Sequence, residues 1–390
     1  MPQASSGSLE RTTIIMSASN STQPQSGGSP SGPSGTMTAY RFVPGKAEPQ
    51  KEVVPIPTPG PDEVLVKILA AGVCHSDCHL LEPPPSYPTI PYSYTLGHEG
   101  AGVVAALGEK VAKDPEASRR FAIGTYVAVL TTNACGSPEC DSCSRGLPNL
   151  CFSVPKLGIG VDGCWAEYIK ARASTIVPVP GNDPSDARLA PGIVAAATDA
   201  VLTPWHALTR VAEVKRGQNL VIFGCGGLGL NAIQIAKNVL GAGTVIASDI
   251  KPESLAVARK VGADFAVKPS DVKALLAERR ILVDVVVDVV GVQSTVDVGV
   301  DILRPAGTLL VVGLGAEKVE LRLLTAAMKQ LVVQMTFGGD CRDLEECLDA
   351  IAAGKVKPEV EERPMDECGK VVCGLAKGEI RARVALMPRL

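Results

Sequence analysis

Several features are scarce in this sequence of 390 residues, and each scarcity excludes a class of function. Lysine and arginine form no run and the net charge is −3, so the chain lacks a basic surface for nucleic acid or an anionic membrane. No apolar stretch is long enough to cross a bilayer. There are only four histidines, which makes their positions informative. We therefore expect the main partner to be a small molecule.

The first 36 residues are almost without charge and consist mainly of Ser, Gly, Pro and Gln. Such a segment buries too little apolar surface to offset the entropy of ordering, so we predict that residues 1–36 form a disordered tail. The apolar residues within 12–16 are too few for the core of a secretory signal. Twelve cysteines without such a signal indicate thiols and thiolates in a reducing compartment rather than a disulfide framework. We expect a cytoplasmic protein.

The pattern of apolar residues changes along the chain and predicts an α/β protein with two domains. In residues 37–66, 124–129 and 175–178, short β runs are bounded by Pro and Gly, as in antiparallel strands. After Pro191, buried strands alternate with helices, which is the pattern of a doubly wound parallel sheet. We predict a β-rich catalytic domain of residues 37–200 and 337–390, interrupted by a cofactor domain of residues 201–336.

A glycine-rich turn, GCGGLG at residues 224–229, follows the apolar run 219–223 and opens a predicted helix at 228–240. Asp249 lies 20 residues after Gly229, at the end of the next predicted strand. In this context the turn is a dinucleotide-binding fingerprint, in which glycines let the backbone approach a pyrophosphate at a helix start. The Asp249 carboxylate can bond the ribose hydroxyls and would repel a 2′-phosphate, which favours NAD over NADP. Lys251 weakens that preference, and the alternative is a packing turn beside a solvated aspartate.

Four cysteines lie within seventeen residues rich in Gly, Pro and Asn, at positions 135, 140, 143 and 151. Four thiolates suit a closed tetrahedral zinc site, which would stabilise a loop with little core of its own. Two disulfides or free thiols are the alternatives. We call Cys135, Cys140, Cys143 and Cys151 the cysteine lobe.

A second constellation has the composition of a catalytic zinc site. Cys74 lies in GVCHSDCH at residues 72–79, and His98 lies in GHEG at residues 97–100. Two residues, Cys164 and Asp199, compete for the third protein ligand. We therefore expect zinc in two roles, catalytic and structural.

Together these segments resemble the zinc-dependent medium-chain alcohol dehydrogenases, from about residue 37 to the C-terminus. The resemblance rests on residues 72–77, 97–100, the cysteine lobe, 162–168, 198–207 and 224–229. It implies a GroES-like catalytic domain beside a Rossmann domain. It also implies reversible oxidation of an alcohol to an aldehyde or ketone, with hydride transfer to NAD, by a homodimer or homotetramer.

The resemblance assigns the third zinc ligand to Asp199 rather than Cys164, because some relatives place aspartate where many place cysteine. The Cys74 thiolate, a neutral His98 and the Asp199 carboxylate also carry the same total charge as two thiolates and one imidazole. Glu99 resembles a glutamate that lies behind the zinc and can swing in, and Asp77 is expected to accept the free N–H of His98.

Other positions are expected to serve the cofactor and the proton. Ser76 and His79 resemble the hydroxyl and imidazole that carry the alcohol proton to solvent. His75 and Arg383 resemble cations that meet the pyrophosphate, and Thr203 resembles a residue near the nicotinamide. The full set of predicted cofactor contacts is His75, Thr203, Gly224, Gly226, Gly227, Leu228, Gly229, Asp249, Val290, Val312, Leu314 and Arg383.

One departure from the family pattern concerns the cysteine lobe. Four residues separate Cys135 from Cys140, where the family usually has two, which makes Cys135 the least secure lobe ligand. His206 has no family counterpart and is expected to be structural. Two other functions remain open, a polyol or amino-alcohol dehydrogenase of the same superfamily and a non-catalytic sensor that binds zinc and NADH.

Overall fold

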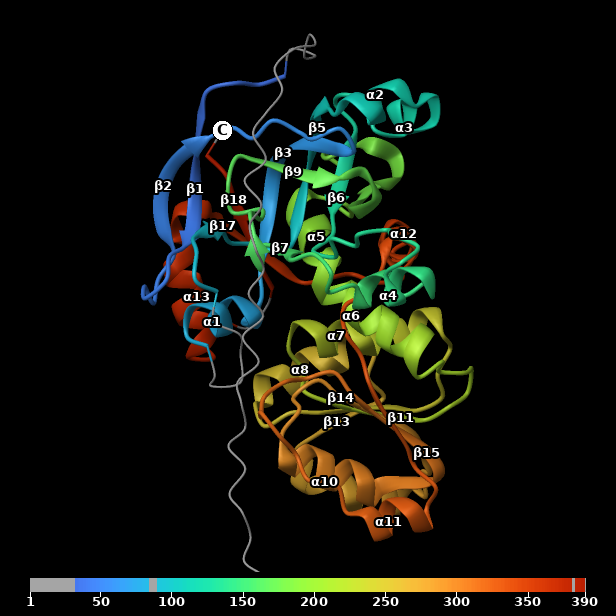
Figure 1. Ribbon diagram of the computed structural model, residues 1–390. Helices are drawn as coiled ribbons and strands as arrows, with labels where there is room; N and C mark the ends of the chain where they lie inside the picture. The colour runs from blue at the N-terminus through green and yellow to red at the C-terminus, as the bar shows by residue number, and fades with distance from the viewer. Residues whose placement is uncertain (1–31, 84–89, 381–382, 390) are drawn as a thin grey trace, which may run out of the picture.

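The computed structural model describes residues 32–83, 90–380 and 383–389, which form two sheet-containing halves joined by helices (Figure 1). The predicted tail lies almost entirely outside the described residues, and β1 begins at Thr36. No helix within the described ranges combines the length and apolar character that a membrane span requires.

The upper half in Figure 1 is built on antiparallel strands, as the alternation of apolar residues predicts. Its main sheet has the order β10-β6-β5-β3-β18-β17, with β9 paired to β3, and β2-β1-β4 form a smaller sheet. The last strand, β18, belongs to this upper half, since its Val384 pairs with Val73 of β3. The strands are β1 (Thr36–Phe42), β2 (Gln50–Pro55), β3 (Glu63–Val73), β4 (Tyr94–Thr95), β5 (Gly100–Leu107), β6 (Tyr126–Val129), β7 (Lys156–Leu157), β8 (Gly160–Val161), β9 (Tyr168–Arg172), β10 (Ile176–Pro178), β17 (Val360–Pro364) and β18 (Arg383–Met387).

Short helices and turns surround this half and connect its strands. They are α1 (His75–Leu81), α2 (Glu109–Lys113), α3 (Pro115–Arg120), α4 (Asp141–Ser144), α5 (Pro191–Ala196), α12 (Cys341–Ala352) and α13 (Cys368–Ala376).

The lower half contains a six-stranded parallel sheet of order β13-β12-β11-β14-β15-β16. Its central strands β11 and β14 are buried along their whole length, which explains why their sequences are continuously apolar apart from two aspartates. The strands are β11 (Leu220–Phe223), β12 (Val245–Ser248), β13 (Phe265–Val267), β14 (Val283–Asp288), β15 (Leu303–Val311) and β16 (Val332–Met335). The helices are α7 (Gly227–Gln234), α8 (Pro252–Lys260), α9 (Val272–Arg279), α10 (Gln293–Ile302) and α11 (Leu323–Met328).

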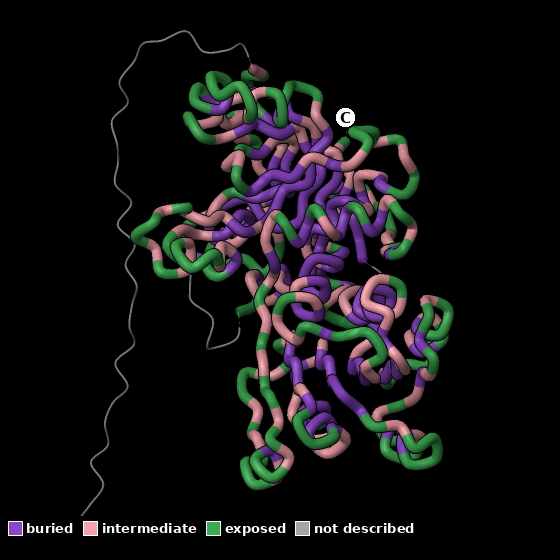
Figure 2. The backbone as a smooth tube through the Cα atoms, turned by 90° about the vertical axis from the view of Figure 1, so that its right-hand side faces the viewer, coloured by how far each residue is buried: buried purple, intermediate pink, exposed green. Residues whose placement is uncertain are grey.

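A single helical run joins the two halves. It passes from α5 through a π-helical turn (Ala197–Val201), α6 (Leu202–His206) and a second π-helical turn (Ala207–Val211). One hydrophobic core cluster includes residues of both sheets and of this run, and Figure 2 shows the buried backbone continuing through the junction. Because the run crosses residue 200, the predicted boundary between residues 200 and 201 falls inside a helix, and the proposed domain limits stay a prediction.

Candidate active site

Cys74 lies where β3 ends and α1 begins, so its position is set by both elements. Its backbone N–H donates to Asp77 Oδ2 at 2.9 Å, which closes the first turn of α1 as a capping interaction. Its Sγ lies 3.6 Å from Ser76 Oγ. The first turn of α1 therefore holds a thiol, a hydroxyl and a buried carboxylate close together.

His98 and Glu99 occupy the turn between β4 and β5, and both side chains are buried. His98 Nδ1 lies 3.2 Å from Asp77 Oδ1, the predicted neighbour of this imidazole, which leaves Nε2 as the available ligand atom. Burial alone would lower the pKa of His98, but Asp77 raises it well above its ordinary value. The pair therefore favours a cation at this position, either a proton or a metal ion.

The carboxylate of Glu99 is completely buried, and neither oxygen accepts a hydrogen bond within the described part of the chain. Gly72 makes room for it, since a Cβ there would lie 1.9 Å from Glu99 Oε2. Burial raises the pKa of Glu99, although Arg383, 3.5 Å from Oε1, opposes this effect. A buried carboxylate without a hydrogen-bond donor is an unusual cost, which a bound cation would relieve.

Asp199 projects from the π-helical turn between α5 and α6. Thr203, one turn later, donates to its Oδ1 at 2.7 Å, and Arg383 Nη2 donates to its Oδ2 at 2.8 Å. Burial alone would raise the pKa of Asp199, but Arg383 lowers it far below the ordinary value. The residue is therefore held as an oriented anion. Arg383 itself is buried, at the start of β18.

Cys74, His98, Glu99 and Asp199 each offer one ligand atom, and these atoms all lie within 4.8 Å of one another. A thiolate, an imidazole and a carboxylate form a donor set that suits zinc, and a second carboxylate stands beside them. Cys164 is not in this group; its Sγ packs against Gly100 instead. The structure thus brings together the ligands expected from the resemblance and leaves the competing cysteine outside.

The predicted relay residues lie on the same short helix. The rings of His75 and His79 are 5.3 Å apart in an edge-on arrangement. His75 is exposed and His79 is partly buried. Burial, and secondarily the neighbouring His75, lower the pKa of His79. A neutral His79 at pH 7 could accept a proton, which is what a relay requires.

The glycine-rich turn has the close packing that a phosphate-binding loop needs. A Cβ at Gly229 would lie 1.8 Å from the Gly224 carbonyl oxygen, whereas one at Gly226 would meet nothing within 4 Å. The loop is therefore tight against the strand and open on its outer side, where α7 begins at Gly227 followed by Leu228. Arg383 approaches this turn, since a Cβ at Gly227 would lie 3.6 Å from its Nε.

The other predicted cofactor contacts cluster at the carboxyl ends of parallel strands. Asp249 Oδ2 accepts the Cys225 amide of the glycine turn at 2.8 Å, so the acidic residue and the loop are joined. Val290 follows β14, and Val312 and Leu314 follow β15. This edge, at the switch point between β11 and β14, is where doubly wound sheets bind dinucleotides.

The four cysteines of the cysteine lobe form a second group whose ligand atoms lie within 4.8 Å of one another. Cys135 belongs to it despite the longer spacing, because a turn closed by the Cys140 N–H and the Ser137 carbonyl at 3.2 Å absorbs the extra residues. Burial would raise the pKa of Cys151, but hydrogen bonds from the Cys135 and Ser153 amides contribute to lowering it to about 6. No disulfide joins the twelve cysteines, all of which are described. The arrangement fits a four-thiolate zinc site.

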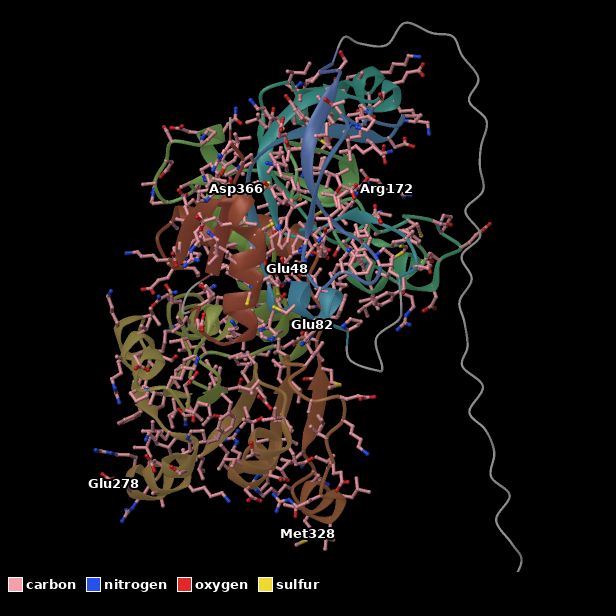
Figure 3. All side chains as sticks on the ribbon, turned by 90° about the vertical axis from the view of Figure 1, so that its left-hand side faces the viewer. Glu48, Glu82, Arg172, Glu278, Met328 and Asp366 are labelled. Atoms are coloured by element: carbon pink, nitrogen blue, oxygen red, sulfur yellow. The ribbon has the colours of Figure 1, made fainter. Side chains whose placement is uncertain are left out.

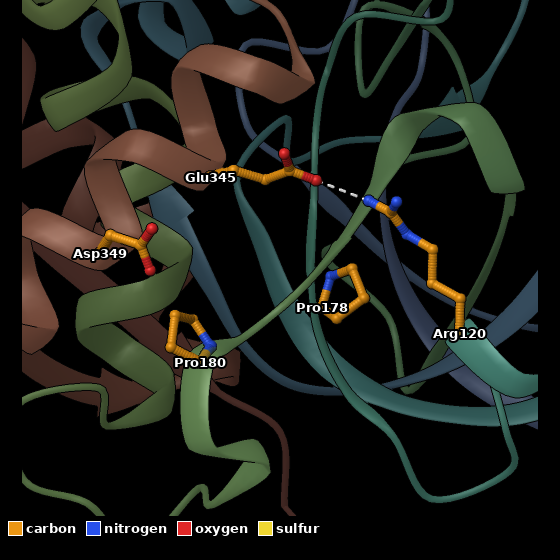
Figure 4. A pocket seen from close by; sticks show the side chains of 5 residues that line it. All are labelled: Arg120, Pro178, Pro180, Glu345 and Asp349. Atoms are coloured by element: carbon orange, nitrogen blue, oxygen red, sulfur yellow. Dashed lines mark hydrogen bonds and ion pairs between the residues drawn. The ribbon is translucent and has the colours of Figure 1, made fainter.

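Two surface hollows lie apart from these groups. One of about 380 Å³ is lined by Arg120, Pro178, Pro180, Glu345 and Asp349, with an ion pair of 2.6 Å between Arg120 and Glu345 (Figure 4). The other, of about 560 Å³, lies beside β1 and β9. Neither is lined by Cys74, His98 or Asp199, so neither is the candidate active site.

Comparison with known proteins agrees with this geometry. Residues 60–181 match the family described as alcohol dehydrogenase GroES-like domain, and residues 227–353 match zinc-binding dehydrogenase. An alcohol dehydrogenase of Geobacillus stearothermophilus is 33% identical over 341 residues, which cover 83% of this chain and 91% of the relative. The chain belongs to the zinc-containing medium-chain alcohol dehydrogenases.

A further sequence relative and two solved structures are also similar to this chain. The Rhizobium meliloti (strain 1021) alcohol dehydrogenase is 34% identical over 342 residues, covering 86% of this chain and 94% of that protein. The solved acetophenone reductase of Geotrichum candidum, in complex with NAD, is 34% identical with a TM-score of 0.77, over 90% of this chain and 97% of the other. The alcohol dehydrogenase of Aeropyrum pernix is 29% identical with a TM-score of 0.78, over 90% and 100%.

Sequence reasoning missed several contacts around these sites. It placed Arg383 at the pyrophosphate but not against Asp199 and Glu99, and it placed Thr203 at the nicotinamide but not on Asp199. His206, expected to be structural, lies 2.6 Å from Asp343 Oδ2 through Nδ1. The i, i+4 spacing of Asp199 and Thr203 was the one local signal available.

Proposed function

We propose that this chain oxidises an alcohol to an aldehyde or ketone, reversibly, with zinc and NAD. The observation that carries the proposal is the junction at Arg383, which contacts the Asp199 carboxylate of the ligand group and approaches the glycine turn. A metal site and a dinucleotide site that share one buried side chain suit hydride transfer between an alcohol and a nicotinamide. Membership of the alcohol dehydrogenase family supports the same reaction.

Cys74, His98 and Asp199 are proposed to hold the catalytic zinc, and Asp77 fixes the tautomer of His98 through Nδ1. When bound, zinc polarises the alcohol oxygen as a Lewis acid and NAD accepts the hydride. Glu99 is held beside the ligands by its ion pair with Arg383. These residues orient the reacting groups in a buried, water-poor site.

The alcohol proton is proposed to leave through chain groups on α1. The Ser76 hydroxyl, close to Cys74, receives it first and passes it toward His79, whose lowered pKa keeps the imidazole able to accept it. His79 then releases the proton to solvent. In the family pattern the nicotinamide ribose lies between Ser76 and His79 on this path.

We propose NAD as the preferred dinucleotide because Asp249 stands at the loop with its carboxylate between two backbone donors. Oδ2 accepts the Cys225 amide, and Oδ1 accepts the Lys251 amide at 2.9 Å. An anion held there would repel a 2′-phosphate. His75 and Arg383 are proposed to meet the pyrophosphate, and Thr203 to lie near the nicotinamide.

We also propose a homodimer or homotetramer, in a reducing compartment such as the cytoplasm. β16 is the edge strand of the parallel sheet, and its Val332, Val333 and Met335 are exposed, as is Met328 of α11 (Figure 3). An exposed apolar edge strand is a template for pairing with a second copy. Sedimentation equilibrium should show a dimer or larger species, and Val333→Lys should shift it toward monomer. A wild-type monomer would contradict the proposal.

One experiment tests the reaction. NADH formation from NAD⁺ is followed at its absorbance with primary, secondary and aromatic alcohols, with polyols and threonine as comparison substrates, while zinc per chain is measured in parallel. We expect alcohol-dependent NADH formation and two zinc ions per chain. Turnover restricted to polyols or threonine would redirect the assignment within the superfamily, and zinc and NADH binding without any turnover would indicate a sensor.

A further inference from the structure

Lys156 is a buried cation at the base of the cysteine lobe. The residue is only 5% exposed, and its Nζ donates to the Asn149 carbonyl oxygen at 3.0 Å. It lies over two aromatic rings, 5.0 Å from the centre of Phe152 and 5.8 Å from that of Phe337. No Asp or Glu side chain forms an ion pair with it among the residues that the structure describes. One carbonyl and two ring faces do not replace the hydration of an ammonium group.

The lysine lies beside the cysteine lobe, because its acceptor Asn149 is two residues before Cys151. Burial lowers the pKa of Lys156, while Cys151 and then Cys143 raise it. These two sulfurs are therefore the electrostatic partners that the fold gives to the lysine. A neutral cluster of thiols would leave this buried ammonium without a counter-charge, which is a costly arrangement.

A metal-bound lobe would relieve two costs at once, the unpaired ammonium of Lys156 and the excess negative charge of the zinc centre. Four thiolates around one Zn²⁺ carry a net charge of −2, since four negative charges exceed two positive ones. The net negative charge of a partly buried centre attracts a nearby cation strongly when that cation is also desolvated. We propose that Lys156 is the counter-charge of the four-cysteine centre and retains zinc there by offsetting its excess negative charge. This inference rests on the proposed zinc occupancy of the lobe.

The same lysine connects the lobe to the junction between the two halves. Its acceptor Asn149 lies in the 3-10 turn Pro148–Leu150, and the Asn149 side chain donates to the Phe337 carbonyl at 2.9 Å. Asn149 Nδ2 also lies 3.4 Å from His206 Nε2, on the helical run that carries Asp199. Lys156 could therefore act through this hydrogen bond rather than through its charge, and the test must separate the two.

Three variants make that separation. Lys156→Gln keeps a hydrogen-bond donor and removes the charge, Lys156→Arg keeps the charge, and Lys156→Met keeps the length alone. Lys110→Gln, which removes an exposed lysine paired with Asp62, is the matched control. The readout is the rate of zinc transfer to a chromophoric chelator at fixed pH. Each variant is measured in the wild-type chain and in a Cys74→Ala chain, in which the remaining zinc is that of the lobe.

We expect Lys156→Gln and Lys156→Met to release lobe zinc at least about tenfold faster than wild type, a difference of roughly 1.4 kcal/mol. Lys156→Arg and Lys110→Gln should release it at the wild-type rate. Release from Lys156→Gln at the wild-type rate overturns the proposal, as does release from Lys156→Arg as fast as from Lys156→Gln. Should the glutamine variant not fold, Lys156→Asn, which also keeps a hydrogen-bond donor without the charge, decides by the same criterion.

The outcome is distinct from failure of the proposed reaction. A wild-type chain that oxidises alcohols with a single zinc ion, lost in Cys74→Ala, would end the inference about Lys156 and leave the reaction intact. A chain with a stable lobe zinc and no turnover would do the reverse.

Discussion

Replacing Asp199 by Ala tests the metal site most directly, because this carboxylate is both a proposed ligand and a partner of a buried cation. In the metal-free protein the change leaves Arg383 with Glu99 at 3.5 Å and the Val73 carbonyl at 3.2 Å. Removing one partner of a buried ion pair costs about 3–5 kcal/mol. Since Glu99 remains, we expect the lower end, a decrease of about 3 kcal/mol in the free energy of unfolding.

The effect on catalysis should be larger than the effect on folding. Without Asp199 the zinc keeps one sulfur and one nitrogen ligand, so we expect loss of the catalytic zinc. Turnover should fall at least about 1,000-fold, which corresponds to roughly 4 kcal/mol. NADH binding, followed by its fluorescence, should survive. The matched variant is Asp199→Cys, which supplies a thiolate at the same position and should retain two zinc ions per chain.

Urea unfolding of the metal-free chains, zinc analysis and NADH titration together check this prediction. An Asp199→Ala chain with two zinc ions and full activity would refute the ligand assignment. An unchanged free energy of unfolding would instead refute the argument about Arg383.

Three further changes address the relay, the cofactor and the lobe. His79→Ala should slow alcohol oxidation at neutral pH. Because the His79 pKa is lowered, wild-type oxidation should decline only as the pH falls below the ordinary histidine range, whereas oxidation by the variant should recover only at higher pH. Identical pH–rate profiles of the two proteins would exclude His79 from the relay. Asp249→Asn keeps the acceptor for the Cys225 amide and removes the negative charge. The kcat/KM with NADP divided by the kcat/KM with NAD should therefore rise about 10- to 100-fold, which corresponds to roughly 1.4–2.8 kcal/mol. An unchanged ratio would contradict the argument that Asp249 repels a 2′-phosphate. The Cys140→Ser chain should lose one zinc ion and have a lower Tm, while the catalytic zinc remains. A variant that keeps both zinc ions would show that Cys140 is not a ligand of the lobe site.

The order of strands and helices could be predicted because each element carries its own local signal. The run at β11 leads directly into the glycine turn, and Asp249 follows 20 residues after Gly229, a spacing that indicates a dinucleotide fold. The family and the proposed reaction followed from such motifs together. The ends and the type of a helix were less predictable. The helix expected at 228–240 is α7 as far as Gln234 and then a π-helical turn as far as Val239. No local sequence pattern indicates this change of helix type.

Contacts between distant segments could not be predicted from spacing. Arg383 and Asp199 lie 184 residues apart and meet only because β18 returns to pair with β3. No local pattern marks Lys156 as a buried cation, and one of its two ring contacts, Phe337, comes from a segment 181 residues away. The choice of Asp199 over Cys164 came from family resemblance, as both are chemically able to bind zinc.

The return of β18 has a consequence for biosynthesis. Arg383, whose guanidinium neutralises the carboxylates around the proposed metal, follows Asp199 by 184 residues. While that segment is still inside the ribosome, a nascent chain can form the glycine turn and the parallel sheet but must hold Glu99 and Asp199 together without their cation. Assembly of the reacting centre therefore waits for the most C-terminal of its residues, long after the segments that carry Glu99 and Asp199 have been made.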